Sequence, residues 1–149
     1  MNELDSSKQM SSSSCTDQNV IFLLIQIGHA LESQLEAALE EVALSMAKMG
    51  ALSKLVDEGE ALTLSDLASR LTCVRSNITQ LVDRLEADGL VTREDDPTDR
   101  RGVRAALTEL GRERHALGVQ KLREVQQKLL KHLSSLNAKM LNNMLTKLK

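Results

Sequence analysis

Residues 62–108 hold two short helical patterns joined by a tight turn and followed at once by a hairpin pattern, and this succession constrains the fold more than any other feature. In the first pattern, LTLSDLASRL, Thr63 or Ser65 is suited to cap the helix, and Asp66 lies in its first turn. The second pattern, VRSNITQLVDRLEADG, ends at Gly89. Its predicted buried face consists of Ile78, Leu81, Val82 and Leu85. Helices of this length and spacing predict a helix-turn-helix unit.

Two alternating runs follow that unit directly. LVTRE and GVRAALT predict two strands, and DDPTDRR, which contains the only proline of the chain, predicts the turn between them. A hairpin immediately after a helix-turn-helix is the winged variant of the motif. We therefore expect a small β-hairpin wing on an otherwise helical chain.

The residues that flank this unit predict helices. Phe22 is the only aromatic residue, so the core must be built from Leu, Ile, Val, Ala and Met, which suits helix-on-helix packing. Residues 1–16 are polar and serine-rich and predict a disordered tail. From Asp17 apolar residues recur at helical spacing, and residues 20–27, VIFLLIQI, are apolar beyond a single stripe, as expected of a helix buried against another subunit. Helical patterning resumes after Thr108 with steps near heptad spacing.

Charge is distributed unevenly although the net charge is only −2. Residues 1–61 carry 3 Lys and Arg against 10 Asp and Glu, whereas residues 109–149 carry 9 against 3. The two ends can attract one another within a chain or between two copies, or both can be solvated helix faces. Residues 62–108 carry 7 against 8, a modest balance for a surface that binds nucleic acid.

The second helix of the predicted helix-turn-helix has a polar outward face. In this motif the second helix enters the DNA major groove with its N-terminal residues nearest the bases. Asn and Gln side chains suit adenine, and Arg suits guanine. The candidate DNA-binding residues are Arg75, Ser76, Asn77, Thr79, Gln80 and Arg84. Taken alone, these residues are equally consistent with a solvated helix face.

The hairpin adds arginines at its tip and on its strands. Nothing in a packed core needs Arg100 and Arg101 at the tip of a turn, and both fit insertion into a narrow minor groove of negative potential. Asp99 is close enough in sequence to pair with Arg101 and fix its direction. The remaining wing candidates, predicted to contact phosphates from the strands, are Arg93 and Arg104.

These residues resemble the wing of the MarR family of bacterial transcription regulators. The family's signature of D-x-R, five residues, then L-T stands here as Asp99, Arg101, Leu107 and Thr108, and NITQLVDRLEADGLVTRE resembles its recognition helix and first wing strand. Val74 departs from the family, which often has a polar capping residue at this point. The resemblance implies an obligate homodimer with interleaved N- and C-terminal helices, and regulation by a small-molecule effector.

The expected fold is mainly α with a small β-hairpin wing, a winged helix-turn-helix with long N- and C-terminal dimerisation helices. We expect a disordered tail (1–16), an N-terminal dimerisation helix (17–45), a DNA-binding lobe (46–108) and C-terminal dimerisation helices (109–149). The expected function is a MarR-like transcription regulator, a repressor that binds a palindromic operator in double-stranded DNA and is released by an effector. The alternative is a winged-helix dimer that serves as a protein-interaction module without sequence-specific DNA binding.

Other chemistries find little support in the sequence. Cys73 is a small buried residue of the turn in the ordinary interpretation and an oxidant-sensing thiol in the alternative, since Arg75 and a helix N-terminus lie nearby. The three histidines have no metal-ligand spacing, and no nucleophile accompanies the paired carboxylates, so we expect no cofactor, metal site or enzymatic activity. Two cysteines suggest a reducing compartment, and residues 20–27 are too few to cross a bilayer. We therefore expect a cytoplasmic protein without membrane contact.

Overall fold

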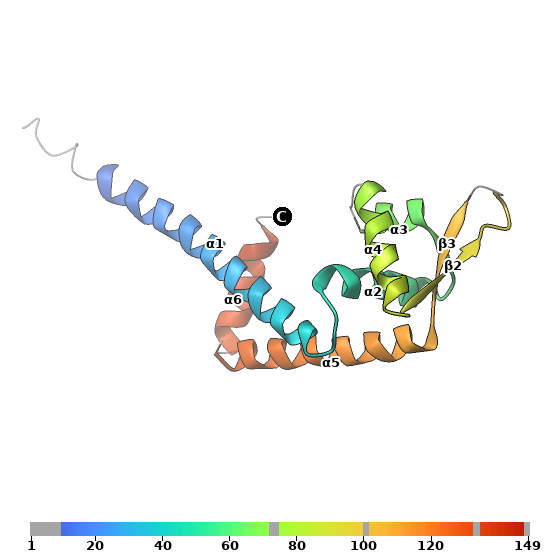
Figure 1. Cartoon of the computed structure of the whole chain (residues 1–149). Helices are drawn as coiled ribbons and strands as arrows, with labels where there is room; N and C mark the ends of the chain where they lie inside the picture. Colours follow the sequence, from blue (N-terminus) through green and yellow to red (C-terminus); the bar gives the residue numbers. More distant parts are fainter. Residues whose placement is uncertain (1–9, 72–74, 100–101, 133–134, 148–149) are drawn as a thin grey trace, which may run out of the picture. The chain divides into compact units, whose positions relative to one another are not determined.

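The computed structural model describes residues 10–71, 75–99, 102–132 and 135–147. The chain divides into two compact units at the junction of Leu35 and Glu36. In chain order, the elements are α1 (Met10–Glu40), α2 (Met46–Glu58), β1 (Leu62–Thr63), α3 (Leu64–Arg70), α4 (Arg75–Ala87), β2 (Val91–Asp95), β3 (Val103–Leu107), α5 (Glu109–His132) and α6 (Ser135–Thr146) (Figure 1).

The start of α1 lies earlier than the sequence predicted. Helical backbone begins at Met10, whereas the sequence pattern placed residues up to 16 in a disordered tail. Serine has only intermediate helix propensity, but extending an existing helix adds one hydrogen bond per residue without the cost of a new nucleus. A serine tract beside a long apolar helix is therefore helical although it carries no apolar period.

The first unit exposes a run of apolar side chains. Between Val20 and Ile27 the apolar side chains are 41% to 61% exposed. None of the helices in the described part of the chain is long and apolar enough to cross a membrane. Burial of this run against a second subunit stays a prediction.

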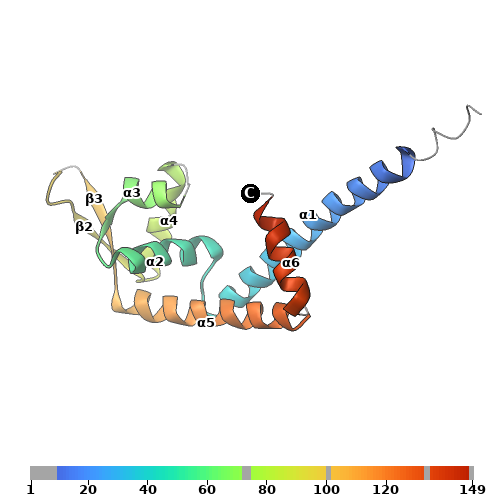
Figure 2. The same cartoon turned by 180° about the vertical axis from the view of Figure 1, so that it is seen from behind.

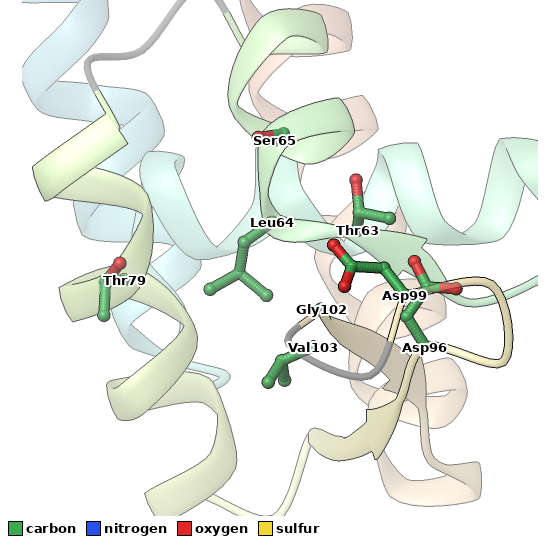
Figure 3. A pocket seen from close by; sticks show the side chains of 8 residues that line it. All are labelled: Thr63, Leu64, Ser65, Thr79, Asp96, Asp99, Gly102 and Val103. Carbon is green, nitrogen blue, oxygen red and sulfur yellow. The ribbon is translucent and has the colours of Figure 1, made fainter.

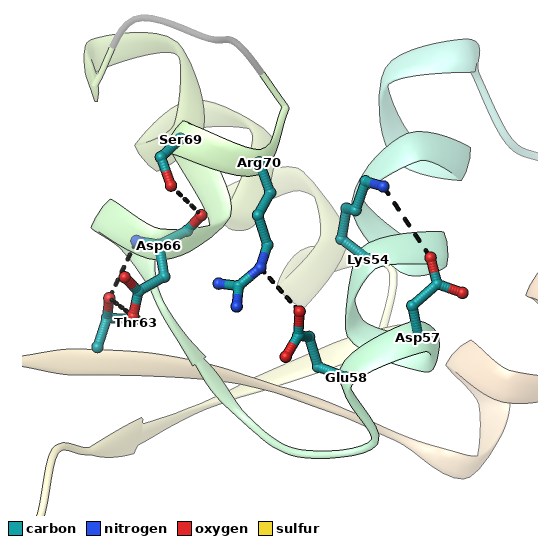
Figure 4. Close-up of polar contacts among 7 residues, drawn as sticks. All are labelled: Lys54, Asp57, Glu58, Thr63, Asp66, Ser69 and Arg70. Atoms are coloured by element: carbon teal, nitrogen blue, oxygen red, sulfur yellow. Dashed lines mark hydrogen bonds and ion pairs between the residues drawn. The ribbon is translucent and has the colours of Figure 1, made fainter.

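Local hydrogen bonds define where the helices of the second unit begin and end. Ser45 caps α2 by accepting a hydrogen bond from a backbone N–H of its first turn at 3.2 Å, and Gly59 ends α2 with a left-handed φ of 73°. Thr63 caps α3 by accepting a hydrogen bond from the Asp66 N–H at 3.0 Å (Figure 4). Of the two predicted caps for α3, the structure therefore selects Thr63.

The wing belongs to a three-stranded antiparallel sheet rather than to a hairpin alone. β3 lies between β1 and β2, with Val91 opposite Leu107 and Leu62 opposite Ala105. The sequence did not indicate β1 as a strand. Because β1 is only two residues long, it has no alternation to detect, and its pairing with β3 alone defines it.

The core of the second unit forms where α2, α3 and α4 pack together with the sheet, and Figures 1 and 2 both show α5 running along this group. Ile78, Val82 and Leu85 of α4 are fully buried, whereas Leu81 is only partly buried. The predicted buried face of α4 is thus confirmed, with Leu81 at its margin. The other fully buried large side chains are Leu39, Leu52, Leu55, Leu67 and Val91.

Two glycines let α5 approach the lobe closely. A Cβ atom at Gly111 would lie 2.1 Å from the carbonyl oxygen of Leu90, and one at Gly118 would lie 2.7 Å from Sδ of Met49. The backbone of α5 therefore lies close to its neighbours, and the obstacle to a larger residue is a backbone carbonyl at Gly111 but the end of a flexible side chain at Gly118. Thr108 caps α5, since its hydroxyl accepts a hydrogen bond from the Gly111 N–H at 3.0 Å.

Polar contacts join the residues that follow α1 to α5 within the second unit. Nη1 of Arg114 donates to the carbonyl oxygen of Val42 at 2.8 Å. Lys121 forms an ion pair with Glu41, in which its ammonium group donates a hydrogen bond to the carboxylate. This hydrogen bond lowers the pKa of the Glu41 carboxyl. One attraction between the acidic N-terminal and basic C-terminal segments therefore operates within the chain.

Candidate nucleic-acid interface

The outward face of α4 is polar. Arg75 and Ser76 belong to its first turn. The other predicted contact residues of this helix are exposed: Asn77, Thr79, Gln80 and Arg84. They lie opposite the buried side chains of Ile78, Val82 and Leu85. The helix therefore presents hydrogen-bonding groups to the outside while its apolar side chains hold it in the core.

Arg93 on β2 is directed toward α4 rather than away from the lobe. Its guanidinium pairs with the carboxylates of Asp83 and Glu86, and its backbone N–H donates to Oε1 of Glu86 at 3.2 Å. The pKa of Arg93 is raised, first by the hydrogen bond to Asp83. This placement does not support the predicted phosphate contact of Arg93. Instead, Arg93 fixes the first wing strand to α4.

The wing turn is built around a carboxylate. Asp96 is 8% exposed, and its Oδ1 accepts hydrogen bonds from the N–H of Thr98 at 2.9 Å and from the Thr98 hydroxyl at 2.8 Å. These bonds hold the pKa of the Asp96 carboxyl below its ordinary value. Two backbone hydrogen bonds close the turn. The Asp96 N–H donates to the carbonyl oxygen of Gly102 at 2.9 Å, and the Gly102 N–H donates to the carbonyl oxygen of Asp99 at 2.8 Å.

Asp96 was not predicted as a functional residue, although the sequence around it contains a signal. An Asp followed two residues later by Thr is typical of an Asx turn, in which the side chain accepts a hydrogen bond from the backbone. Arg104 on β3 lies beside this carboxylate, with Nε 3.6 Å from Oδ1. That Nε atom is buried and forms no hydrogen bond with the part of the chain that is described. The wing therefore contains a charged pair beneath its turn.

A cavity of about 550 Å³ lies between α4 and the wing (Figure 3). Thr79 lies on its α4 side, and Asp96 and Asp99 lie on its wing side. Its remaining lining residues are Thr63, Leu64, Ser65, Gly102 and Val103. The cavity thus lies between the candidate DNA-binding residues of α4 and those of the wing, and both carboxylates are on its wing side.

Three predicted residues lie outside the described part of the chain. They are Cys73, Arg100 and Arg101. Their predicted roles in oxidant sensing and minor-groove contact, and the predicted pair of Asp99 with Arg101, stay predictions. Among the described residues, no group of three or more His, Cys, Asp or Glu side chains is placed to hold a metal ion.

Known proteins match the winged-helix segment. Residues 44–103 match the model of the MarR family. Over 50 residues the chain is 46% identical to YkoM of Bacillus subtilis, named as an uncharacterized HTH-type transcriptional regulator. That match covers 34% of this chain and 32% of YkoM, so the chain spans about a third of the length of this relative.

Solved structures share the fold over most of the chain. A MarR-like transcription regulator from Bacillus cereus has a TM-score of 0.78 at 23% identity, covering 89% of this chain and 95% of that one. A mutant MarR from E. coli complexed with operator DNA has a TM-score of 0.73 at 24% identity, covering 87% and 93%. At these identities the likeness concerns the fold, and it confirms a mainly helical winged helix-turn-helix with long flanking helices. The family and YkoM are transcriptional regulators rather than enzymes. The resemblance to the MarR family is thereby confirmed, since residues 44–103 match its model and the described residues have the winged helix-turn-helix fold of the solved structures.

Proposed function

We propose that this chain is a cytoplasmic, homodimeric transcription regulator that binds double-stranded DNA. The observation that carries the proposal is that α4 has two different faces. One face is fully buried in the core, and the other exposes Asn77, Gln80 and Arg84. Asn and Gln form paired hydrogen bonds with adenine, and Arg does so with guanine. A helix held in this way, beside a wing, is suited to enter a major groove.

The wing would reach the neighbouring minor groove. In this proposal Arg100 and Arg101 enter that groove, Asp99 orients Arg101, and Arg104 contacts a phosphate. The sugar–phosphate backbone between the two grooves would then pass over the cavity that separates α4 from the wing. We leave Arg93 out of the proposed contacts because its guanidinium is engaged with two carboxylates.

A homodimer would give the operator its symmetry. The exposed apolar side chains of residues 20–27, and Met140 and Met144 of α6, which are 64% and 56% exposed, are surfaces that a second copy would bury. Two copies of α4 placed about 34 Å apart would read an imperfect palindrome. A small-molecule effector that changes this spacing would release the DNA, and such a protein acts as a repressor.

The alternative is a winged-helix dimer that binds a protein and does not read DNA sequence. The modest charge of residues 62–108 favours it, because acids slightly outnumber bases there. Several of these acids, however, are paired within the lobe. Arg93 pairs with both Asp83 and Glu86, and Lys48, which lies outside residues 62–108, pairs with Asp88. Because Lys48 is not among the 7 bases of residues 62–108, its charge offsets the excess of one acid in that segment, which favours the DNA-binding proposal.

The test is a mobility shift of the purified protein on a duplex that spans the region upstream of its own gene. For the wild type we expect sub-micromolar binding that resists competitor DNA. Arg101→Ala should weaken binding at least about tenfold and reduce the slope of log affinity against log salt concentration by roughly 1. Lys54→Ala is the matched control. It removes one positive charge from α2, where Nζ of Lys54 lies 4.0 Å from Oδ2 of Asp57 (Figure 4). We expect this variant to bind the duplex with little change in affinity.

The outcomes separate the two functions. Specific binding that depends on Arg101 supports a wing-dependent regulator. Failure of the wild type to bind any segment specifically at low salt, without effector, would refute it, and a pull-down of partner proteins would then test the alternative.

A further inference from the structure

The wing holds an acidic side chain in a place where electrostatics alone would disfavour one. Asp96 lies on the wing side of the cavity that the DNA backbone is proposed to cross, and a negative charge near phosphates weakens DNA binding. Asp95 precedes it on the same strand end, but the Asp95 side chain is exposed. Two neighbouring carboxylates of the wing therefore differ in burial.

The surroundings of Asp96 show what its carboxylate does for the turn. Oδ1 accepts hydrogen bonds from both the N–H and the hydroxyl of Thr98, so it fixes the residue that follows Pro97. Gly102 returns close to the same side chain, because a Cβ atom at Gly102 would lie 2.8 Å from Cβ of Asp96 and 3.2 Å from its Oδ2. Both ends of the turn are thus packed against one side chain.

Arg104 gives the carboxylate a second contact. Its Nε lies 3.6 Å from Oδ1 of Asp96, and the Arg104 side chain is 30% exposed, against 7% for the Asp96 side chain. Removing the carboxylate would leave Arg104 without this nearby negative charge. By charge alone, the loss of the negative charge of Asp96 and the release of the positive charge of Arg104 would each increase attraction to DNA.

We infer that Asp96 is a positioning residue for DNA binding. Its carboxylate holds Thr98 and Gly102 in the positions that the wing needs to engage DNA, and this benefit outweighs its unfavourable charge. The inference rests on the proposed function, because it concerns how the wing meets DNA. It predicts that removing this acid weakens DNA binding, whereas removing its exposed neighbour does not.

The experiment compares four variants with the wild type by fluorescence anisotropy on a labelled duplex from the upstream region that the wild type shifts. Asp96→Ala removes the acceptor, and Asp96→Asn keeps an acceptor oxygen for the Thr98 N–H. Thr98→Val removes only the hydroxyl donor, and Asp95→Ala is the matched charge control. We expect a loss of at least about tenfold for Asp96→Ala, a smaller loss for Thr98→Val, and rescue to within about threefold by Asp96→Asn. Asp95→Ala should bind as tightly as the wild type or more tightly.

Hydrogen exchange supplies a readout that needs no DNA. In Asp96→Ala we expect the amides of Thr98 and Gly102 to exchange at least about tenfold faster, while the amides of α4 keep their protection. If Asp96→Ala does not fold, Thr98→Val carries both measurements, since it removes one hydrogen bond and no charge.

Each outcome has a distinct meaning. Tighter or unchanged binding by Asp96→Ala, or unchanged exchange of the two amides, would overturn the positioning role while the proposed function stands. Absence of wild-type binding would refute the proposed function and, with it, the role of Asp96 in DNA binding. Equal losses for Asp95→Ala and Asp96→Ala would also overturn it, because a general effect of wing acids would then explain the result.

Discussion

Replacing Gly111 by alanine tests how α5 is joined to the lobe. The new Cβ atom would lie 2.1 Å from the carbonyl oxygen of Leu90, 2.8 Å from Cδ1 of Leu107 and 3.1 Å from the Leu90 carbonyl carbon. Real Cβ atoms keep at least 3.0 Å, so the backbone would have to move by about 0.9 Å, the difference between 3.0 and 2.1 Å. A side chain could rotate away, but a backbone carbonyl cannot.

The backbone of Leu90 is held on both sides. Its N–H donates to the carbonyl oxygen of Leu85 at 2.9 Å, its carbonyl oxygen accepts from the Thr108 N–H at 3.2 Å, and the residue is 2% exposed. Overpacking of this kind costs about 1–3 kcal/mol or more, and alanine in place of glycine returns at most about 1 kcal/mol of helix propensity. We therefore expect Gly111→Ala to lower the free energy of unfolding by about 2 kcal/mol.

Gly118→Ala is the matched control, because it makes the same change in the same helix against flexible neighbours. Its Cβ atom would lie 2.7 Å from Sδ of Met49 and 3.0 Å from Cδ1 of Leu44, both ends of side chains. Methionine adapts readily, so the gain in helix propensity should offset much of the cost and leave the variant within about 1 kcal/mol of the wild type. Urea unfolding followed by circular dichroism at one fixed protein concentration measures both variants. The reasoning is refuted if Gly111→Ala is as stable as the wild type, or more stable than Gly118→Ala.

Three further predictions concern the core, a strained residue and a histidine. Leu85→Ala should cost about 2–5 kcal/mol in urea unfolding because Leu85 is fully buried, and a loss well below 1 kcal/mol would contradict the packing described. Ala43 has a φ of 55°, so Ala43→Gly should relieve left-handed strain and raise stability by about 1 kcal/mol; a lower melting temperature would argue against strain there. Burial lowers the pKa of His115, whose Nε2 lies 3.1 Å from Oγ of Ser53, so the neutral form is favoured in the folded state. Stability should therefore be full above the unfolded pKa of about 6.5 and decline as pH falls from there through the lower folded pKa, and His115→Gln should remove this part of the pH dependence of the urea midpoint.

Features that depend on neighbours along the chain could be predicted from the sequence. Thr63, one of the two predicted caps, marks the start of α3 because a side-chain N-cap is a local structure. The face of α4 was predictable for a related reason, since a period of 3.6 residues separates buried Ile78 and Val82 from exposed Gln80. The winged succession follows from such local patterns placed in order.

Features that depend on contacts between distant residues could not be predicted in this way. Arg93 was a reasonable phosphate contact by its place on a wing strand, but the folding of β2 against α4 puts Asp83 and Glu86 beside it. In the sequence, Asp96 is one of several acids in a polar turn. Its burial became evident only in the structure, where Gly102 lies against its side chain.

The sequence by itself determined the succession of α3, α4 and the two wing strands, the two candidate caps of α3 and the polar outward face of α4, because short-range sterics and hydrogen bonds specify them. Only the tertiary structure decided that Leu62 and Thr63 form a third strand, that Arg93 is held within the lobe, and that Asp96 lies beneath the wing turn. The physical reason is that burial and ion pairing depend on which elements meet in space. A pattern along the chain shows that a residue is charged, but not whether another part of the fold neutralises that charge.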